Sequence, residues 1–235
     1  MIVRTENDGV ILITQPDHAH LSGRIMEHCV PLRASPRRAS ILRAIREHDN
    51  GWTEEDAAPT IDPATGRIAD FVNIPLHVRH GVWPRGVARL ADDPWAAALV
   101  AQHAITVYDR FRSDEAWKPF FARMEDMRNE QVKASGLPLD ALLADYPYVR
   151  LGDLLSLAFC TAWTDEHRIA GWAVRQSDNK VVVTPGAFGG TEVQFEVPAA
   201  DIRCLTFQSD SDLRAALKSA QAVTLRGAVV DGGRS

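Results

Sequence analysis

The spacing of apolar residues changes along this chain, and that change constrains the fold more than any other sequence feature. Through roughly the first 175 residues, apolar side chains recur every three or four positions, as in Leu21, Ile25 and Cys29, which is typical of amphipathic helices. Beyond that point apolar and polar residues alternate, most clearly in 192–197, which indicates strands. We therefore expect a mainly α fold, a helical bundle that carries a small antiparallel β-sheet.

The small sheet is expected to join the two ends of the chain. Apolar segments 2–4 and 10–13 flank a polar turn at 7–9, whose Asp-Gly pair favours a β-hairpin. An isolated hairpin is marginally stable, so we expect it to pair with strands in 181–197 and 202–207.

The chain divides by composition into a helical part, residues 1–175 with the N-terminal hairpin, and a β-rich C-terminal element, residues 176–235, packed on the same domain. Asp93 before Pro94 predicts a helix N-terminus. Pro147 is expected to start a later helix, because proline is tolerated in the first helical turn and disrupts a helix interior.

Charge and cysteine content narrow the classes of function. The 235 residues carry a net charge of −5, and a surface of that sign argues against nucleic acid and anionic membranes as partners. The three cysteines are far apart and predict neither a disulfide framework nor a paired zinc motif. With no signal peptide and no stretch long enough to span a bilayer, we expect a cytoplasmic protein. A homo-oligomer is compatible with the sequence.

An ordered set of histidines and aspartates lies on or beside the predicted helices. The candidate metal ligands are His18, His48, Asp49, His80, His103 and Asp153. Neutral imidazoles and carboxylates together suit divalent Fe, Mn, Co, Ni or Zn. The adjacent His48-Asp49 pair can give one ion two ligands, and Asp153 would be costly to bury unpaired in its leucine-rich helix.

Several positions have alternatives. His20 competes with His18 as the first ligand, and His77 competes with His80, which lies three residues further along the same predicted helix. His103 is also compatible with an ordinary buried histidine hydrogen-bonded to a carbonyl group. His48 can equally be a residue that favours a helix C-terminus.

The set resembles the HD-domain superfamily of metal-dependent phosphohydrolases, whose pattern is a His, an adjacent His-Asp pair and a later Asp on a helix. The matching residues are His18, His48-Asp49 and Asp153, and the resemblance covers roughly residues 1–175. The segments around His18 and His48 are similar to a bacterial branch of HD-like proteins. The resemblance implies an HD-like helical bundle.

Dinuclear members of that superfamily have two more histidines between the His-Asp pair and the final Asp. His80 and His103 fall in this interval. The resemblance therefore implies one or two divalent ions, with Asp49 bridging them in the second case.

The expected function is hydrolysis of a small-molecule phosphate ester or phosphoanhydride. The predicted catalytic residues are Asp49, with Arg79 and Arg85 beside His80 as donors to a phosphate group. The alternatives are an HD-type di-iron oxygenase and a non-catalytic metal-binding sensor or structural protein.

Overall fold

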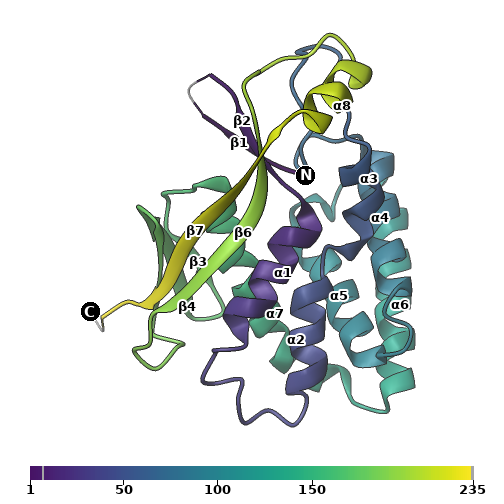
Figure 1. Cartoon of the computed structure of the whole chain (residues 1–235). Helices are drawn as coiled ribbons and strands as arrows, with labels where there is room; N and C mark the ends of the chain where they lie inside the picture. Colours follow the sequence, from purple (N-terminus) through teal and green to yellow (C-terminus); the bar gives the residue numbers. More distant parts are fainter. Residues whose placement is uncertain (7, 234–235) are drawn as a thin grey trace.

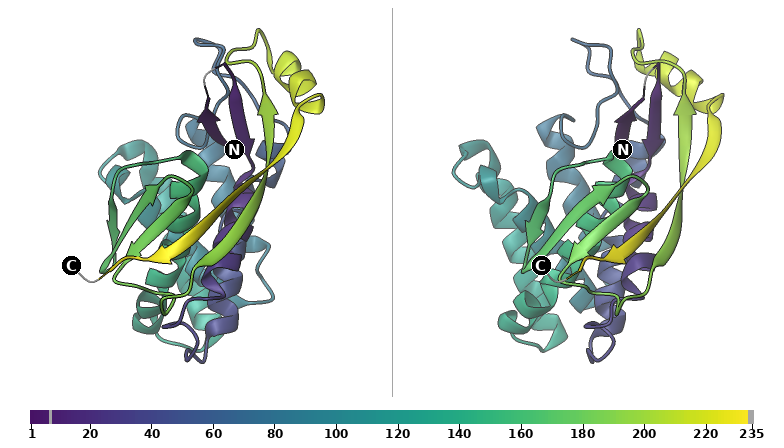
Figure 2. Two further views of the ribbon diagram at one scale, coloured as in Figure 1. Left: turned by 60° about the vertical axis from the view of Figure 1, so that its left-hand side comes forward. Right: turned by 90° about the vertical axis from the view of Figure 1, so that its left-hand side faces the viewer.

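Helices and a curled sheet form two layers in the computed structural model, which describes residues 1–6 and 8–233 (Figure 1). Asn7, in the turn expected at 7–9, and residues 234–235, at the end of the expected C-terminal element, lie outside the described residues. The sheet brings together both ends of the chain, because the N-terminal strands lie beside the C-terminal ones (Figure 2).

The elements are named in chain order. The helices are α1 (Gln15–Met26), α2 (Arg38–Glu47), α3 (Thr53–Ala57), α4 (Leu76–Ala88), α5 (Pro94–Val107), α6 (Lys118–Ser135), α7 (Leu139–Thr161) and α8 (Asp210–Lys218), with short 3-10 turns η1 (Asn50–Trp52), η2 (Asp109–Phe111) and η3 (Glu115–Trp117). The strands are β1 (Ile2–Thr5), β2 (Val10–Ile13), β3 (His167–Ile169), β4 (Trp172–Ser177), β5 (Lys180–Thr184), β6 (Val193–Ile202) and β7 (Gln221–Asp231).

The sheet has seven strands in the order β1-β2-β6-β7-β5-β4-β3. The β5–β7 pair is parallel and the other pairs are antiparallel. The expected class, a mainly α bundle with a small antiparallel sheet, is therefore wrong. The expected contact between the hairpin and the C-terminal strands is present, because β2 pairs with β6 from Val10 opposite Ile202 to Leu12 opposite Ala200.

The sheet is larger than expected because two of its parts have no strand pattern in the sequence. Strands β3 and β4 begin shortly after α7 and carry mixed polar and aromatic residues, and β4 crosses the compositional boundary at residue 175. The first half of β7 is exposed or half-buried on both faces, so apolar and polar residues need not alternate there. Residues 203–207, expected to be a strand, form a loop instead.

Capping residues explain where the helices that hold the site begin. The Thr14 side chain caps α1 by accepting a hydrogen bond from the backbone N–H of Asp17, at 3.0 Å. Asp93 caps α5 through the N–H of Ala96, which confirms that predicted start. Pro147, by contrast, does not start a helix but lies inside the continuous α7.

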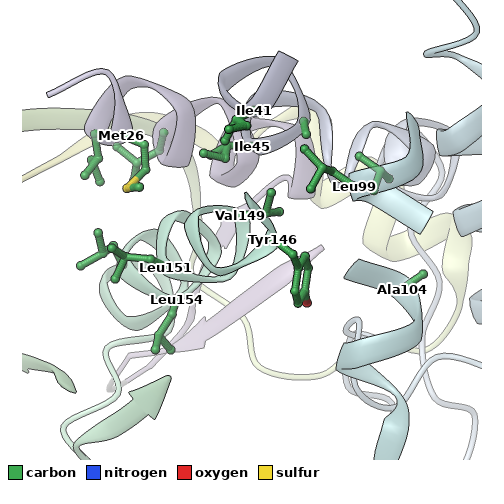
Figure 3. Packing of buried hydrophobic residues seen from close by; sticks show 14 of the residues in the cluster. Met26, Ile41, Ile45, Leu99, Ala104, Tyr146, Val149, Leu151 and Leu154 are labelled. Atoms are coloured by element: carbon green, nitrogen blue, oxygen red, sulfur yellow. The ribbon is translucent and has the colours of Figure 1, made fainter. Parts of the chain in front are cut away.

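Helix α7 passes through the centre of the hydrophobic core, and Figure 3 shows Met26 of α1 and Ile45 of α2 facing it. Gly152 permits this close approach. A β-carbon there would lie 2.8 Å from Ile45 Cγ2 and 3.0 Å from Met26 Cγ, closer than real contacts of that kind. The three helices therefore pack tightly at the residue that precedes Asp153.

None of the helices in residues 1–6 and 8–233 is both long and apolar enough to cross a membrane.

Candidate metal centre

Five of the predicted ligands meet in the interior. His18 comes from α1, His48 and Asp49 follow α2, His103 lies in α5 and Asp153 lies in α7. Each is at most 7% exposed. Together they form two overlapping groups with metal-ligand spacing, one of His18, His48 and Asp49, the other of His48, His103 and Asp153.

The donor atoms lie at the separations that one ion requires. His18 Nε2 is 3.2 Å from His48 Nε2 and 3.6 Å from Asp49 Oδ2, and His48 Nε2 is 3.5 Å from the same oxygen. Asp153 Oδ1 lies 3.3 Å from His18 Nε2 and 3.6 Å from His48 Nε2. Metal–ligand bonds of about 2.0–2.2 Å place the donors of a tetrahedral ion roughly 3.3–3.6 Å apart.

The other nitrogen of each imidazole is held by the protein. His48 Nδ1 donates to the carbonyl oxygen of Ile45 at 2.7 Å, and His18 Nδ1 is hydrogen-bonded to the Ser156 hydroxyl. Such outer contacts orient metal-ligating histidines and select their tautomer. Donation through Nδ1 leaves a lone pair on Nε2, which faces the cluster.

His103 is oriented in the same way. Its Nδ1 lies 3.3 Å from the Tyr146 hydroxyl, and its Nε2 lies 3.7 Å from Asp153 Oδ2. The second separation is too long for a hydrogen bond. Only one ring nitrogen of His103 therefore has a hydrogen-bond partner in the described part of the protein. An ordinary buried histidine would have a partner for both ring nitrogens.

The electrostatics of the cluster favour a positive charge beside its two carboxylates. Burial opposes protonation of His48, but Asp49 and Asp153 outweigh it and raise the pKa of His48 to about 9. Burial raises the pKa of Asp49, because it disfavours the charged carboxylate. Although burial acts in the same direction on Asp153, the imidazoles of His18 and His48 beside it hold the pKa of Asp153 well below its usual range. Burial lowers the pKa of His103 well below its ordinary value, so this imidazole is neutral. The metal-free cluster thus keeps a proton where an ion would supply positive charge.

A pocket of about 500 Å³ opens onto this cluster, and its lining includes His18, Asp49, His103 and Asp153. Its walls carry the aromatic residues Trp52, Phe71, Trp83, Tyr108 and Trp163. Its cationic lining consists of Arg79, Arg110 and Arg150. The cluster is therefore buried but reachable by a small molecule, as in ligand sites of this size.

The structure separates His80 from the other predicted ligands. Its ring stacks on Phe120 with centroids 5.1 Å apart and meets Trp117 edge-on at 4.9 Å. The alternative, His77, lines a different cavity. Of the two candidates for the first ligand, His18 is in the cluster, whereas His20 is exposed beside Glu47.

The two predicted catalytic arginines differ in position. Arg79 lines the pocket, with its guanidinium 5.6 Å from the ring centroid of Trp117. Arg85 instead binds the carbonyl oxygen of Gly51 and the carboxylate of Glu55, so its donors tie α4 to the segment after His48.

Three residues that contact the cluster itself were missed from the sequence, and all lie on α7. Tyr146, Arg150 and Ser156 lie seven, three and three residues from Asp153, which places them near one face of a helix. Polar residues at that spacing in an apolar helix were a usable signal. Arg150 contacts Asp153 directly, with NH1 2.8 Å from Oδ2.

Comparison with known proteins identifies a family. Residues 1–203 match the family described as "Protein of unknown function (DUF3891)". The chain belongs to this family. The matched region of this DUF3891 chain contains every member of the cluster and most of the sheet. No curated protein and no solved structure matches the chain.

Proposed function

We propose that this protein is a metal-dependent hydrolase of a small-molecule phosphate ester or phosphoanhydride, related to the HD-domain phosphohydrolases. The observation that carries the proposal is the buried His/Asp cluster at the bottom of a pocket with a cationic lining. The ordered pattern of His18, His48-Asp49 and Asp153 supports the relationship.

His18, His48, Asp49 and Asp153 would hold the ion. A divalent ion supplies a Lewis acid that activates water and stabilises charge on a phosphoryl group. Because Asp49 and Asp153 line the pocket, a substrate can reach that position from one side. An accessible position of this kind distinguishes a catalytic site from a closed structural one.

The arginines and aromatic residues would bind the substrate. Arg79 and Arg110 have no ion pair among the described residues, so their guanidinium groups have donors for phosphate oxygens. The aromatic walls exclude water and provide a surface for the organic part of the ester. The pocket size favours a small molecule over a macromolecule.

The test is elemental analysis of protein purified without added metal or chelator, together with an assay for phosphate release from a panel of phosphomonoesters, phosphodiesters and nucleoside triphosphates. His48→Ala should remove both the metal and the activity. His20→Ala is the matched control, because His20 is exposed and outside the cluster.

The same measurements separate the alternatives. Iron bound at two ions per chain with consumption of oxygen would indicate the di-iron oxygenase. Tightly bound metal with neither phosphate release nor oxygen consumption would indicate a sensor or structural role. Wild-type protein that binds no divalent metal would refute the proposal.

A further inference from the structure

The two carboxylate oxygens of Asp153 face different partners. Oδ1 lies 3.3 Å from His18 Nε2 and 3.6 Å from His48 Nε2. Oδ2 lies 3.7 Å from His103 Nε2 and accepts a hydrogen bond from Arg150 NH1 at 2.8 Å. A second ion that used His103 would bind on the Oδ2 side, where the guanidinium of Arg150 already is.

The second group of donors is not a complete site of its own. It shares His48 with the first group. The Nδ1 of His48 is engaged by the Ile45 carbonyl, and Nε2 has a single lone pair, which can serve only one ion. Of the ligands considered for a second ion, His103, Asp153 Oδ2 and the second oxygen of a bridging Asp49 then remain, because His80 lies against Phe120 and Trp117.

Arg150 is a partly buried residue of the same helix as Asp153. It lies one helical turn before Asp153 on α7, and its side chain is 25% exposed. Its Nε is buried without a hydrogen-bond partner in the part of the chain that the structure describes. The guanidinium therefore binds one ligand carboxylate, and the residue also lines the pocket.

Charge balance favours one divalent ion together with Arg150 over two divalent ions. The cluster contains two carboxylates, Asp49 and Asp153. One divalent ion together with Arg150 leaves a single net positive charge, which suits an anionic substrate. Two divalent ions together with Arg150 would leave three positive charges in a buried site, and an ion on Oδ2 would lie within roughly 5 Å of the guanidinium nitrogen, given metal–oxygen bonds of about 2.0–2.2 Å.

We propose that the centre takes one divalent ion and that the Arg150 guanidinium occupies the place of a second cation. This inference rests on the metal centre of the proposed function. In that reaction Arg150 would supply the fixed positive charge that a second ion supplies in two-metal sites, since arginine clamps and metal ions both stabilise a phosphoryl group in transfer.

The experiment is titration of the metal-free protein with Mn²⁺, with stoichiometry measured by elemental analysis and by electron paramagnetic resonance, which distinguishes an isolated Mn²⁺ from a coupled pair. Wild-type protein should saturate at one ion per chain. Arg150→Met removes the charge and keeps much of the side-chain volume, so the stoichiometry should double and the spectrum of a coupled pair should appear.

Two further variants make the result specific. Arg150→Lys keeps the cation and should still bind one ion. The double variant Arg150→Met/His103→Ala removes a ligand of the second ion and should return to one. Arg150→Gln replaces Arg150→Met if circular dichroism shows that the methionine variant does not fold.

Two results would overturn the inference: wild-type protein that binds a coupled pair, or a folded Arg150→Met variant that still saturates at one ion. If wild-type protein binds one ion and hydrolyses phosphate esters while Arg150→Met stays at one, only the role of Arg150 fails. If wild-type protein binds no ion, the proposed function fails with it.

Discussion

Replacement of Ser156 by alanine tests whether contacts around the cluster determine its affinity for metal. The Ser156 hydroxyl is buried and contacts His18 Nδ1, the carbonyl oxygen of His18 at 3.0 Å and the Ser22 hydroxyl at 2.7 Å. Without it, His18 Nδ1 loses the partner that selects its tautomer. The imidazole is then free to present a protonated Nε2 to the ion.

The expected loss of metal affinity follows from the usual effect of removing such contacts. Removing a partner of a ligating histidine typically lowers metal affinity about 10–100-fold, or about 1.4–2.8 kcal/mol. In a domain of this size each kcal/mol shifts the melting temperature by about 2–4 °C, so the metal-saturated variant should melt roughly 3–11 °C lower from this effect alone. The metal-free protein should also lose about 1–3 kcal/mol, because a buried polar group is left unsatisfied.

The assay is competition with a chelator of known affinity, combined with denaturant unfolding of the metal-free protein. Thr161→Ala is the matched control, because Thr161 is a hydroxyl residue of the same helix that bonds the Leu157 carbonyl at 2.7 Å and is not in the cluster. Equal metal affinity of Ser156→Ala and wild type, or the same loss in Thr161→Ala, would refute the reasoning.

Four other predictions concern the cluster and its packing. The pKa of His48 is raised from 6.5 to about 9, so its protonation contributes its full stability to the metal-free protein below pH 6.5. About 3 kcal/mol of the free energy of unfolding should be lost as the pH rises through 9. A stability that does not change with pH over this range would contradict the prediction. Metal binding displaces that proton, so affinity should increase about tenfold per pH unit in the same range, as isothermal titration calorimetry would measure. His80→Ala should keep full metal content and His48→Ala should lose it; a loss in both would return His80 to the ligand set. Gly152→Ala should destabilise the protein by about 1–3 kcal/mol in denaturant unfolding, because its β-carbon would overlap neighbouring helices, whereas Gly81→Ala, with no atom within 4 Å, should be neutral or stabilising.

Much of the candidate site was predictable because its signals are local. The His48-Asp49 pair puts two potential donors next to each other in sequence at a helix end. Asp153, buried in a leucine-rich helix, needs a positive partner, so its environment was implied by its neighbours in sequence. These residues are in the cluster, as predicted from the chain alone.

The rotation of helices about their own axes was not predictable in the same way. His80 has the right spacing from His103 in sequence, yet α4 turns it towards Trp117 and Phe120. Arg150 was not predicted from the sequence, and the rotation of α7 turns it, with Asp153, towards the cluster. A helix changes direction by about 100° per residue, so packing against neighbours decides which of several polar residues faces the interior.

By itself the sequence determined which segments could become helices and which His and Asp residues could bind metal, because caps, apolar spacing and ligand chemistry act over a few residues. Only the tertiary structure decided the seven-stranded mixed sheet, in which β7 lies between β6 and β5, and the approach of His18 to Asp153. The physical reason is that strand order and close helix packing depend on contacts between residues far apart in sequence. Their free energy arises only when the whole core is assembled.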